Sequence, residues 1–117
     1  MTLADTTTLK LICDMRSGRR VTVVSGTPAD MREVFRVMQT YADSGEKIRR
    51  ANGDEAILSA DRTGTIGFTT AGRFDVYHRG LSADVVVFDV RPTEHLLFLA
   101  HAALAASPIR EIVLKGW

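Results

Sequence analysis

The chain has 117 residues, of which 45% are hydrophobic and 25% are charged, and its formal net charge is +1. This is the composition of an ordinary globular protein, and a net charge so close to zero gives no bulk electrostatic reason to expect nucleic-acid or membrane binding. Cys13 is the only cysteine, which excludes an intrachain disulfide and a cysteine-based zinc cluster. No apolar stretch approaches the ~20 residues of a membrane helix. We therefore expect a cytoplasmic protein that does not contact a membrane.

The first third of the chain predicts two strands. Residues 1–8 are polar and rich in threonine, and we expect a flexible N-terminal segment there, followed by a single α/β domain over residues 9–117. Apolar and polar residues alternate over residues 9–14, which weakly favours a strand. After a turn, the apolar run at residues 21–24 predicts a second and better strand.

The clearest helical signal begins at Thr27. Thr27 is a natural N-cap, Pro28 suits the first helical position, and Asp30 completes a capping-box pattern. Apolar residues then recur on one face at helical spacing: Met31, Val34, Phe35, Met38, Tyr41 and Ala42. Gly45 is the expected stop signal, so this segment predicts an amphipathic helix packed on a sheet.

The middle of the chain predicts a hairpin. Residues 46–55 are polar and carry a turn signal at Asn52-Gly53. Residues 56–58 and 65–69 have the pattern of two short strands that pair antiparallel. Residues 71–79 favour a loop.

The last third predicts a strand, a helix and a strand. Residues 85–88 form a continuous apolar run before Asp89, which is typical of a strand buried on both faces of a parallel sheet. Pro92 and Thr93 open a second helix with a mostly apolar surface, and residues 112–114 form a final strand. Because helices separate the strands, we expect an α/β fold: a small, mainly parallel sheet flanked by helices, with an antiparallel hairpin insertion.

One stretch carries the most specific pattern of the chain. Residues 79–84 (Arg-Gly-Leu-Ser-Ala-Asp) lead directly into residues 85–89 (Val-Val-Val-Phe-Asp). Together with residues 20–27, 31–35, 50–57, 64–68 and 112–116, this stretch resembles the middle of the ATPase domain of phage terminase large subunits. The likeness covers most of the chain and extends more remotely to helicase-like P-loop NTPases. It implies a truncated P-loop NTPase-like fold in which the valine-rich run takes the place of the family's Walker B strand.

The chain departs from that family at two features that hydrolysis needs. A P-loop wraps backbone N–H groups around phosphates and places a lysine beside them, but no Gly-Lys pair occurs in the sequence. Val90 stands where the family has a glutamate that activates the attacking water. We interpret Asp89 as a relic, because a single carboxylate holds magnesium weakly. We therefore expect no enzyme activity, no catalytic residues, no metal site and no cofactor.

Five residues are candidates for contact with nucleic acid or with a protein partner: Arg49, Arg50, Arg73, Tyr77 and Arg79. Arginine makes planar contacts with phosphate and carboxylate groups, and aromatic side chains can stack on exposed bases. An ordinary solvated surface is the simpler interpretation of the same residues.

Three functions stay open on the sequence. The first is a non-catalytic binding module of phage or prophage origin, acting in the host cytoplasm through protein–protein contacts. The second is a nucleic-acid-binding protein that uses the arginine-bearing loops, with DNA as a candidate partner. The third is an ATPase fragment completed by a second chain that carries the P-loop.

The resemblance also predicts an open sheet edge. In the family, the P-loop strand lies beyond the strand that corresponds to residues 112–114. A chain without it keeps three neighbouring strands with residues 85–88 in the middle, and residues 9–14 either fill the vacancy or pair with residues 21–24. An edge left open invites pairing with another chain. We therefore expect a homodimer formed through this edge.

Overall fold

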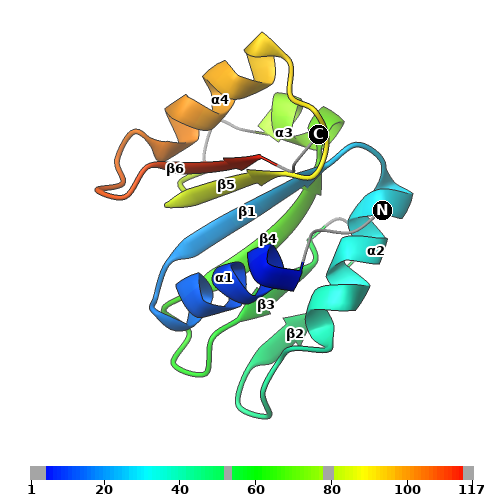
Figure 1. Cartoon of the computed structure of the whole chain (residues 1–117), viewed down its shortest axis with the longest axis vertical. Helices are drawn as coiled ribbons and strands as arrows, with labels where there is room; N and C mark the ends of the chain where they lie inside the picture. The colour runs from blue at the N-terminus through cyan, green and yellow to red at the C-terminus, as the bar shows by residue number, and fades with distance from the viewer. Residues whose placement is uncertain (1–4, 52–53, 78–80, 115–117) are drawn as a thin grey trace.

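Figure 1 shows the computed structural model of the chain, which describes residues 5–51, 54–77 and 81–114. The elements follow in this order: α1 (Asp5–Arg16), β1 (Arg20–Ser25), α2 (Pro28–Gln39), β2 (Lys47–Arg49), β3 (Ala56–Leu58), β4 (Thr65–Thr70), α3 (Ala71–Tyr77), β5 (Val85–Phe88), α4 (Glu94–Leu104) and β6 (Glu111–Leu114). Within these described ranges, the strands form one six-stranded sheet in the order β2-β3-β4-β1-β5-β6.

β1 lies inside a parallel block of strands. It pairs in parallel with β4 on one side and with β5 on the other, and β5 pairs in parallel with β6. β2 and β3 extend the sheet beyond β4 as antiparallel strands. The expected fold class is confirmed: the chain is an α/β protein with a mainly parallel sheet, an antiparallel hairpin and flanking helices.

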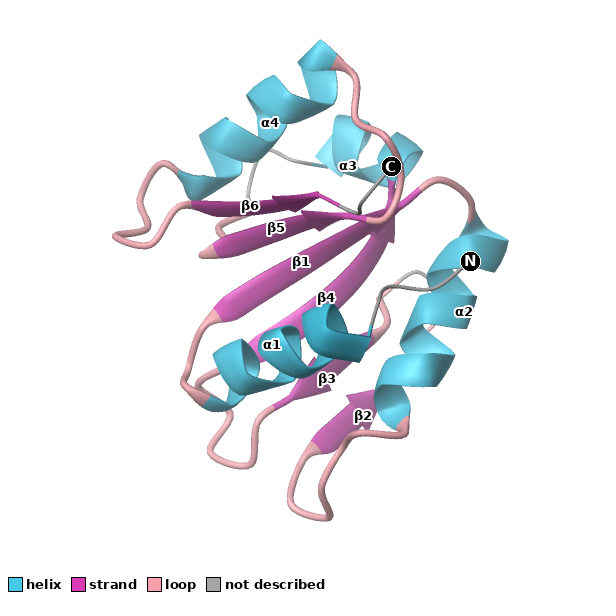
Figure 2. Ribbon diagram, viewed as in Figure 1, coloured by secondary structure: helices cyan, strands magenta, loops and turns pink. Residues whose placement is uncertain are grey.

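Helices cover both faces of the sheet, as Figure 2 shows. α1 and α2 pack on one face, here called the α1–α2 face, whose core includes Val21 and Val23 of β1. α3 and α4 pack on the other, the α3–α4 face, whose core includes Val24 of β1 and Phe88 of β5. β1 and β5 are therefore buried on both sides, which explains why their sequences are apolar runs without alternation.

α2 forms as its sequence predicts. Thr27 Oγ1 accepts a hydrogen bond from the backbone N–H of Asp30 at 3.1 Å, so the predicted N-cap is confirmed. The buried side chains are those of the predicted apolar face: Met31, Val34, Phe35 and Met38. The helix ends at Gln39, earlier than the stop predicted at Gly45.

The strand predicted over residues 9–14 is wrong, because these residues belong to α1. The buried residues Thr8, Leu11, Ile12 and Met15 recur at helical spacing, and this period outweighs the short alternation. The helix begins at Asp5, so residues 5–8 form its first turn although we expected a flexible segment. Residues 1–4 lie outside the described residues.

Two further elements were not predicted. Residues 71–77 form α3 rather than a loop; the Thr70 hydroxyl accepts a hydrogen bond from the N–H of Arg73, and Phe74 packs edge-on against Phe88. The polar segment before the hairpin contains β2, which pairs antiparallel with β3. A helix and a strand this short gain their stability from tertiary packing and pairing, which a local pattern does not record.

The predicted order of the three strands is confirmed. β5 lies between β1 and β6, and β6 is the last strand of the sheet. Residues 9–14 neither extend the sheet beyond β6 nor pair with β1, since they are helical. The strand on the other side of β1 is β4.

Candidate functional site

Asp89 and Ser25 lie side by side where β5 and β1 end. Both residues are buried, and Ser25 Oγ lies 3.5 Å from Asp89 Oδ2, within hydrogen-bond range. From this point the chain leaves β1 toward α2 on one face and leaves β5 toward α4 on the other. Such a divergence at the carboxyl edge of parallel strands is where α/β proteins commonly bind ligands.

The residue after Asp89 is Val90, which faces the turn between β1 and α2. A Cβ atom at Gly26 would lie 3.3 Å from Val90 Cγ2, so Val90 packs against the turn between β1 and α2.

Within residues 5–51, 54–77 and 81–114, no group of three or more His, Cys, Asp and Glu side chains could hold a metal ion. His95 Nε2 lies 2.7 Å from Asp75 Oδ1, which links α4 to α3.

The neighbouring arginines Arg49 and Arg50 contact different partners. Arg49 Nη1 lies 3.4 Å from Asp54 Oδ2, whereas Arg50 Nη2 donates a hydrogen bond to Gln39 Oε1 of α2 at 2.9 Å. Arg73 lies in the first turn of α3. Tyr77 ends α3, but the structure does not describe its side chain, and Arg79 lies outside the described residues.

The α3–α4 face is covered only in part, because α3 and α4 pack mainly over β4, β1 and β5. The rest of that face carries one set of alternating side chains, here called the open sheet face: Arg20, Thr22, Lys47, Arg49, Ala56, Leu58, Thr65, Gly67 and Thr69. Across the strands, Arg49 neighbours Ala56, Ala56 neighbours Gly67, and Gly67 neighbours Thr22. Because Ala56, Gly67 and Thr22 are small residues, the middle of the face is a depression.

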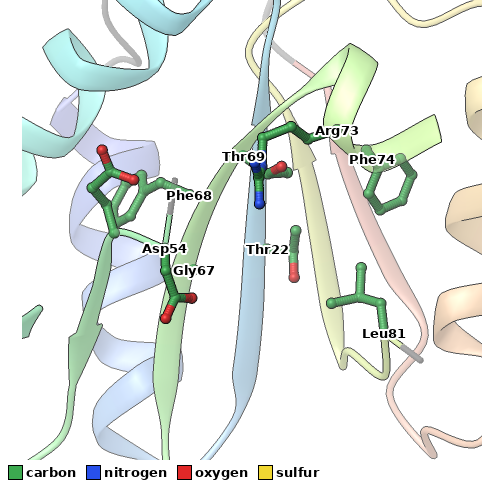
Figure 3. A pocket seen from close by; sticks show the side chains of 9 residues that line it. Thr22, Asp54, Gly67, Phe68, Thr69, Arg73, Phe74 and Leu81 are labelled. Carbon is green, nitrogen blue, oxygen red and sulfur yellow. The ribbon is translucent and has the colours of Figure 1, made fainter. Parts of the chain in front are cut away.

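A cleft of about 240 Å³ lies over this depression. Figure 3 shows Arg73 and Thr69 at one end of it, Thr22 on its floor, and Asp54 and Leu81 on opposite sides. Since Asp54 also pairs with Arg49, the cleft brings two of the predicted arginines, Arg49 and Arg73, to the same face. Arg50 is not part of it, because it turns toward α2.

Glu55 borders the same cleft and is buried. Its Oε1 has no hydrogen-bond partner among the residues that the structure describes. The N–H of Phe68 donates to the Glu55 carbonyl oxygen at 3.0 Å, and cross-strand neighbours share a face. The Glu55 side chain therefore lies on the side of Phe68, whose ring packs in the core of the α1–α2 face against Phe35.

The two edges of the sheet differ in chemistry. β2 carries Lys47 and Arg49, and charged side chains on an edge strand oppose pairing with another chain. β6 carries three aliphatic residues in a row, and its side chains are only half-buried or exposed. Leu114 is 52% exposed.

Sequence reasoning missed Arg20 and Lys47, which border the open sheet face. The signal available was the alternation of Thr65, Gly67 and Thr69 with buried apolar residues, which marks one face of β4 as polar or small. Which cations neighbour that face depends on the register between strands, and the register is not readable from the separate segments.

Comparison of the chain with protein-family models, curated proteins and solved structures found no match. In the described part of the chain, no helix combines the length and the apolar character needed to cross a membrane.

Proposed function

We propose that the chain is a non-catalytic binding module that acts through protein–protein contacts, and that β6 is its contact strand. The observation that carries this proposal is the position of β6: it is the last strand of the sheet that the described residues form, and its residues include Ile112, Val113 and Leu114. An edge strand presents a row of unpaired backbone N–H and C=O groups on its outer side. Apolar side chains beside these groups favour a partner strand over water.

Aliphatic side chains lie on both faces next to this edge. On the α3–α4 face, Ile112 lies in the same packing region as Leu97 of α4, and both are only partly buried. On the α1–α2 face, Val113 is partly buried against the core, and Glu111 is held by Lys10, with Lys10 Nζ 2.8 Å from Glu111 Oε1. A strand added beside β6 would cover the aliphatic groups on both faces, and their burial is the main source of binding free energy.

The occupant that we propose is a second copy of the chain, paired antiparallel through β6. A two-fold interface uses the same patch on both copies, so it forms best from a surface that complements itself. An aliphatic strand does so, because the run of Ile112, Val113 and Leu114 in each copy would lie against the same run of the other in reverse order. The charged β2 edge does not have this property.

The terminase resemblance supports the same position. That family places a further strand beyond the one that corresponds to β6, and the order β1-β5-β6 agrees with this arrangement. We propose that the chain descends from such a motor domain and has kept its sheet for binding. In this account Asp89 is a structural relic packed beside Ser25.

The proposal is tested by sedimentation velocity over a wide range of protein concentration. We expect a concentration-dependent dimer for the natural chain and a monomer for Leu114→Lys, because a lysine there places a charge in the interface. Val76→Lys is the matched control: Val76 is 66% exposed on α3, so the same change is made away from β6. A monomer at every concentration, or equal weakening by both variants, would contradict the proposal.

A further inference from the structure

Four cations surround the open sheet face. Arg20 and Lys47 lie in one row across the strands, joined by the pairs Arg20–Thr65, Thr65–Leu58 and Leu58–Lys47. Arg49 lies two residues along β2 from Lys47, and Arg73 borders the cleft from α3. Arg20 and Lys47 are three strand spacings apart, or about 14 Å at ~4.8 Å per strand. The cations are therefore spread around the face rather than gathered at one point.

The charges of Arg20, Lys47 and Arg49 are only partly compensated. The exposed Lys47 ammonium forms no ion pair with a residue that the structure describes, and Arg49 pairs with Asp54 at 3.4 Å in an exposed position. The Arg20 guanidinium lies near Asp84 and helps to lower the pKa of that carboxyl group, for which the main cause is the hydrogen bond from the Arg20 backbone N–H. Exposed pairs of this kind contribute little free energy and exchange readily for another anion.

Hydroxyl groups lie between the cations. Thr22, Thr65 and Thr69 point to the open sheet face, with Gly67 among them. Threonine hydroxyls donate hydrogen bonds to phosphate and sugar oxygens, and the missing side chain at Gly67 lets a ligand approach the backbone. The face thus combines dispersed positive charge, neutral donors and a cleft of about 240 Å³.

We propose that the open sheet face binds single-stranded nucleic acid through its phosphates. An extended polyanion matches cations that are spread around a hollow, and a flexible strand can follow the hollow beneath Arg73. A rigid duplex is convex and cannot enter it. Grooves that bind single strands combine positive charge along the backbone path with sequence-tolerant contacts. The proposal adds a ligand on a surface separate from the β6 edge, so either can fail without the other.

Phosphate contacts give the binding a definite salt dependence. Each contact to a single strand releases counterions and contributes about −0.7 to the slope of log K against log salt concentration. Contacts from Arg20, Lys47, Arg49 and Arg73 therefore predict a slope of about −3. Binding should show little preference for base sequence, because phosphates are the same at every position.

The test is fluorescence anisotropy with a labelled oligothymidylate of about 16 nucleotides, titrated with the full chain at several salt concentrations. We expect saturable binding at low salt, and Arg20→Gln/Lys47→Gln should weaken it about tenfold and make the slope shallower by about 1.4. Arg32→Gln/Arg36→Gln is the matched control, because it removes two cations from α2 on the opposite face. Circular dichroism of both variants checks that they fold alike.

Three results would overturn the proposal. The first is an absence of binding by the natural chain at low salt. The second is equal weakening by the two double variants, which would show a response to net charge rather than to this face. The third is that a duplex of the same length, or poly-glutamate of the same charge, binds as tightly as the single strand, which would assign the face to a duplex or to an acidic protein. If Arg20→Gln/Lys47→Gln does not fold, Lys47→Gln alone against Arg32→Gln gives the same comparison.

Discussion

Asp84 Oδ2 accepts a hydrogen bond from the backbone N–H of Arg20 at 2.9 Å, so the residue before β5 holds the first residue of β1. The other oxygen, Oδ1, accepts a hydrogen bond from Ser107 Oγ at 2.7 Å in the turn between α4 and β6. One carboxylate thus links the starts of three neighbouring parallel strands, β1, β5 and β6. It lies at the opposite end of β5 from Asp89. It therefore stabilises the fold and is not part of the site at the carboxyl edge of the sheet.

Asp84→Ala is expected to destabilise the protein by roughly 1–2 kcal/mol, since two hydrogen bonds to a charged acceptor are lost. Urea unfolding at about pH 7 measures the difference. The pKa of Asp84 is lowered from its ordinary value of 3.8, chiefly by the Arg20 N–H and then by the Ser107 hydroxyl. A carboxyl group with a lowered folded-state pKa stabilises the fold above its unfolded pKa, and this contribution is lost as pH falls through the folded value. The two proteins should therefore converge in stability in acid, and a constant difference down to about pH 2 would contradict this role.

Gly64→Ala is expected to disrupt the fold. A Cβ atom at Gly64 would lie 1.7 Å from the carbonyl oxygen of Met15, and the backbone at the end of α1 would have to move. We expect a loss of at least about 3 kcal/mol, or no folded protein. Gly72→Ala is the control, because a Cβ there has nothing within 4 Å and should change stability by less than about 1 kcal/mol. Thermal unfolding compares the two, and a stable Gly64→Ala protein would contradict the close approach of α1 and β4.

Glu55→Met is expected to stabilise the protein by about 1 kcal/mol or more. Glu55 Oε1 is buried without a hydrogen-bond partner among the described residues, and such an oxygen costs free energy that an apolar side chain of similar length does not. Asp54→Asn is the control for removing a negative charge from the same segment, since Asp54 is exposed. Chemical unfolding of both variants measures their free energies of unfolding relative to the natural chain. A marked loss of stability in Glu55→Met would show that the carboxylate has a role that its described neighbours do not reveal.

Hydrolysis of ATP with magnesium is expected to stay at the background rate. The sequence contains no Gly-Lys pair to hold the phosphates, and Val90 stands where the terminase family that the sequence resembles has a catalytic glutamate. A phosphate-release assay measures this on the purified chain. Hydrolysis above background that disappears in Asp89→Ala would contradict a non-catalytic role.

The elements that the sequence predicts well are those whose local pattern agrees with their burial. β1 and β5 are apolar runs because both faces are covered, and α2 has a cap and an apolar stripe that act together. α1 was not predicted because residues 9–14 alternate between apolar and polar side chains and also repeat at helical spacing. Only burial shows which of these two periods the structure uses. α3 and β2 were missed because each is too short to form without its neighbours.

The residues of the binding surfaces could likewise be predicted only in part. Arg49 and Arg73 could be picked out as residue types, but their placement on one face depends on the pairing of β2, β3 and β4. The same pairing adds Arg20 and Lys47, whose sequence neighbours give no hint of a shared surface. Arg50 follows Arg49 directly, yet it contacts α2 instead. Register and helix placement, rather than composition, decide which cations can act together.

The claim that β6 is the contact strand is tested most directly by hydrogen–deuterium exchange of its backbone amides at increasing protein concentration. Pairing with a second copy would protect the outward N–H groups of Glu111–Leu114, so their exchange should slow as the dimer forms. The amides of β2, at the charged edge of the same sheet, should not change. Exchange in β6 that is fast and independent of concentration would contradict the proposed assembly.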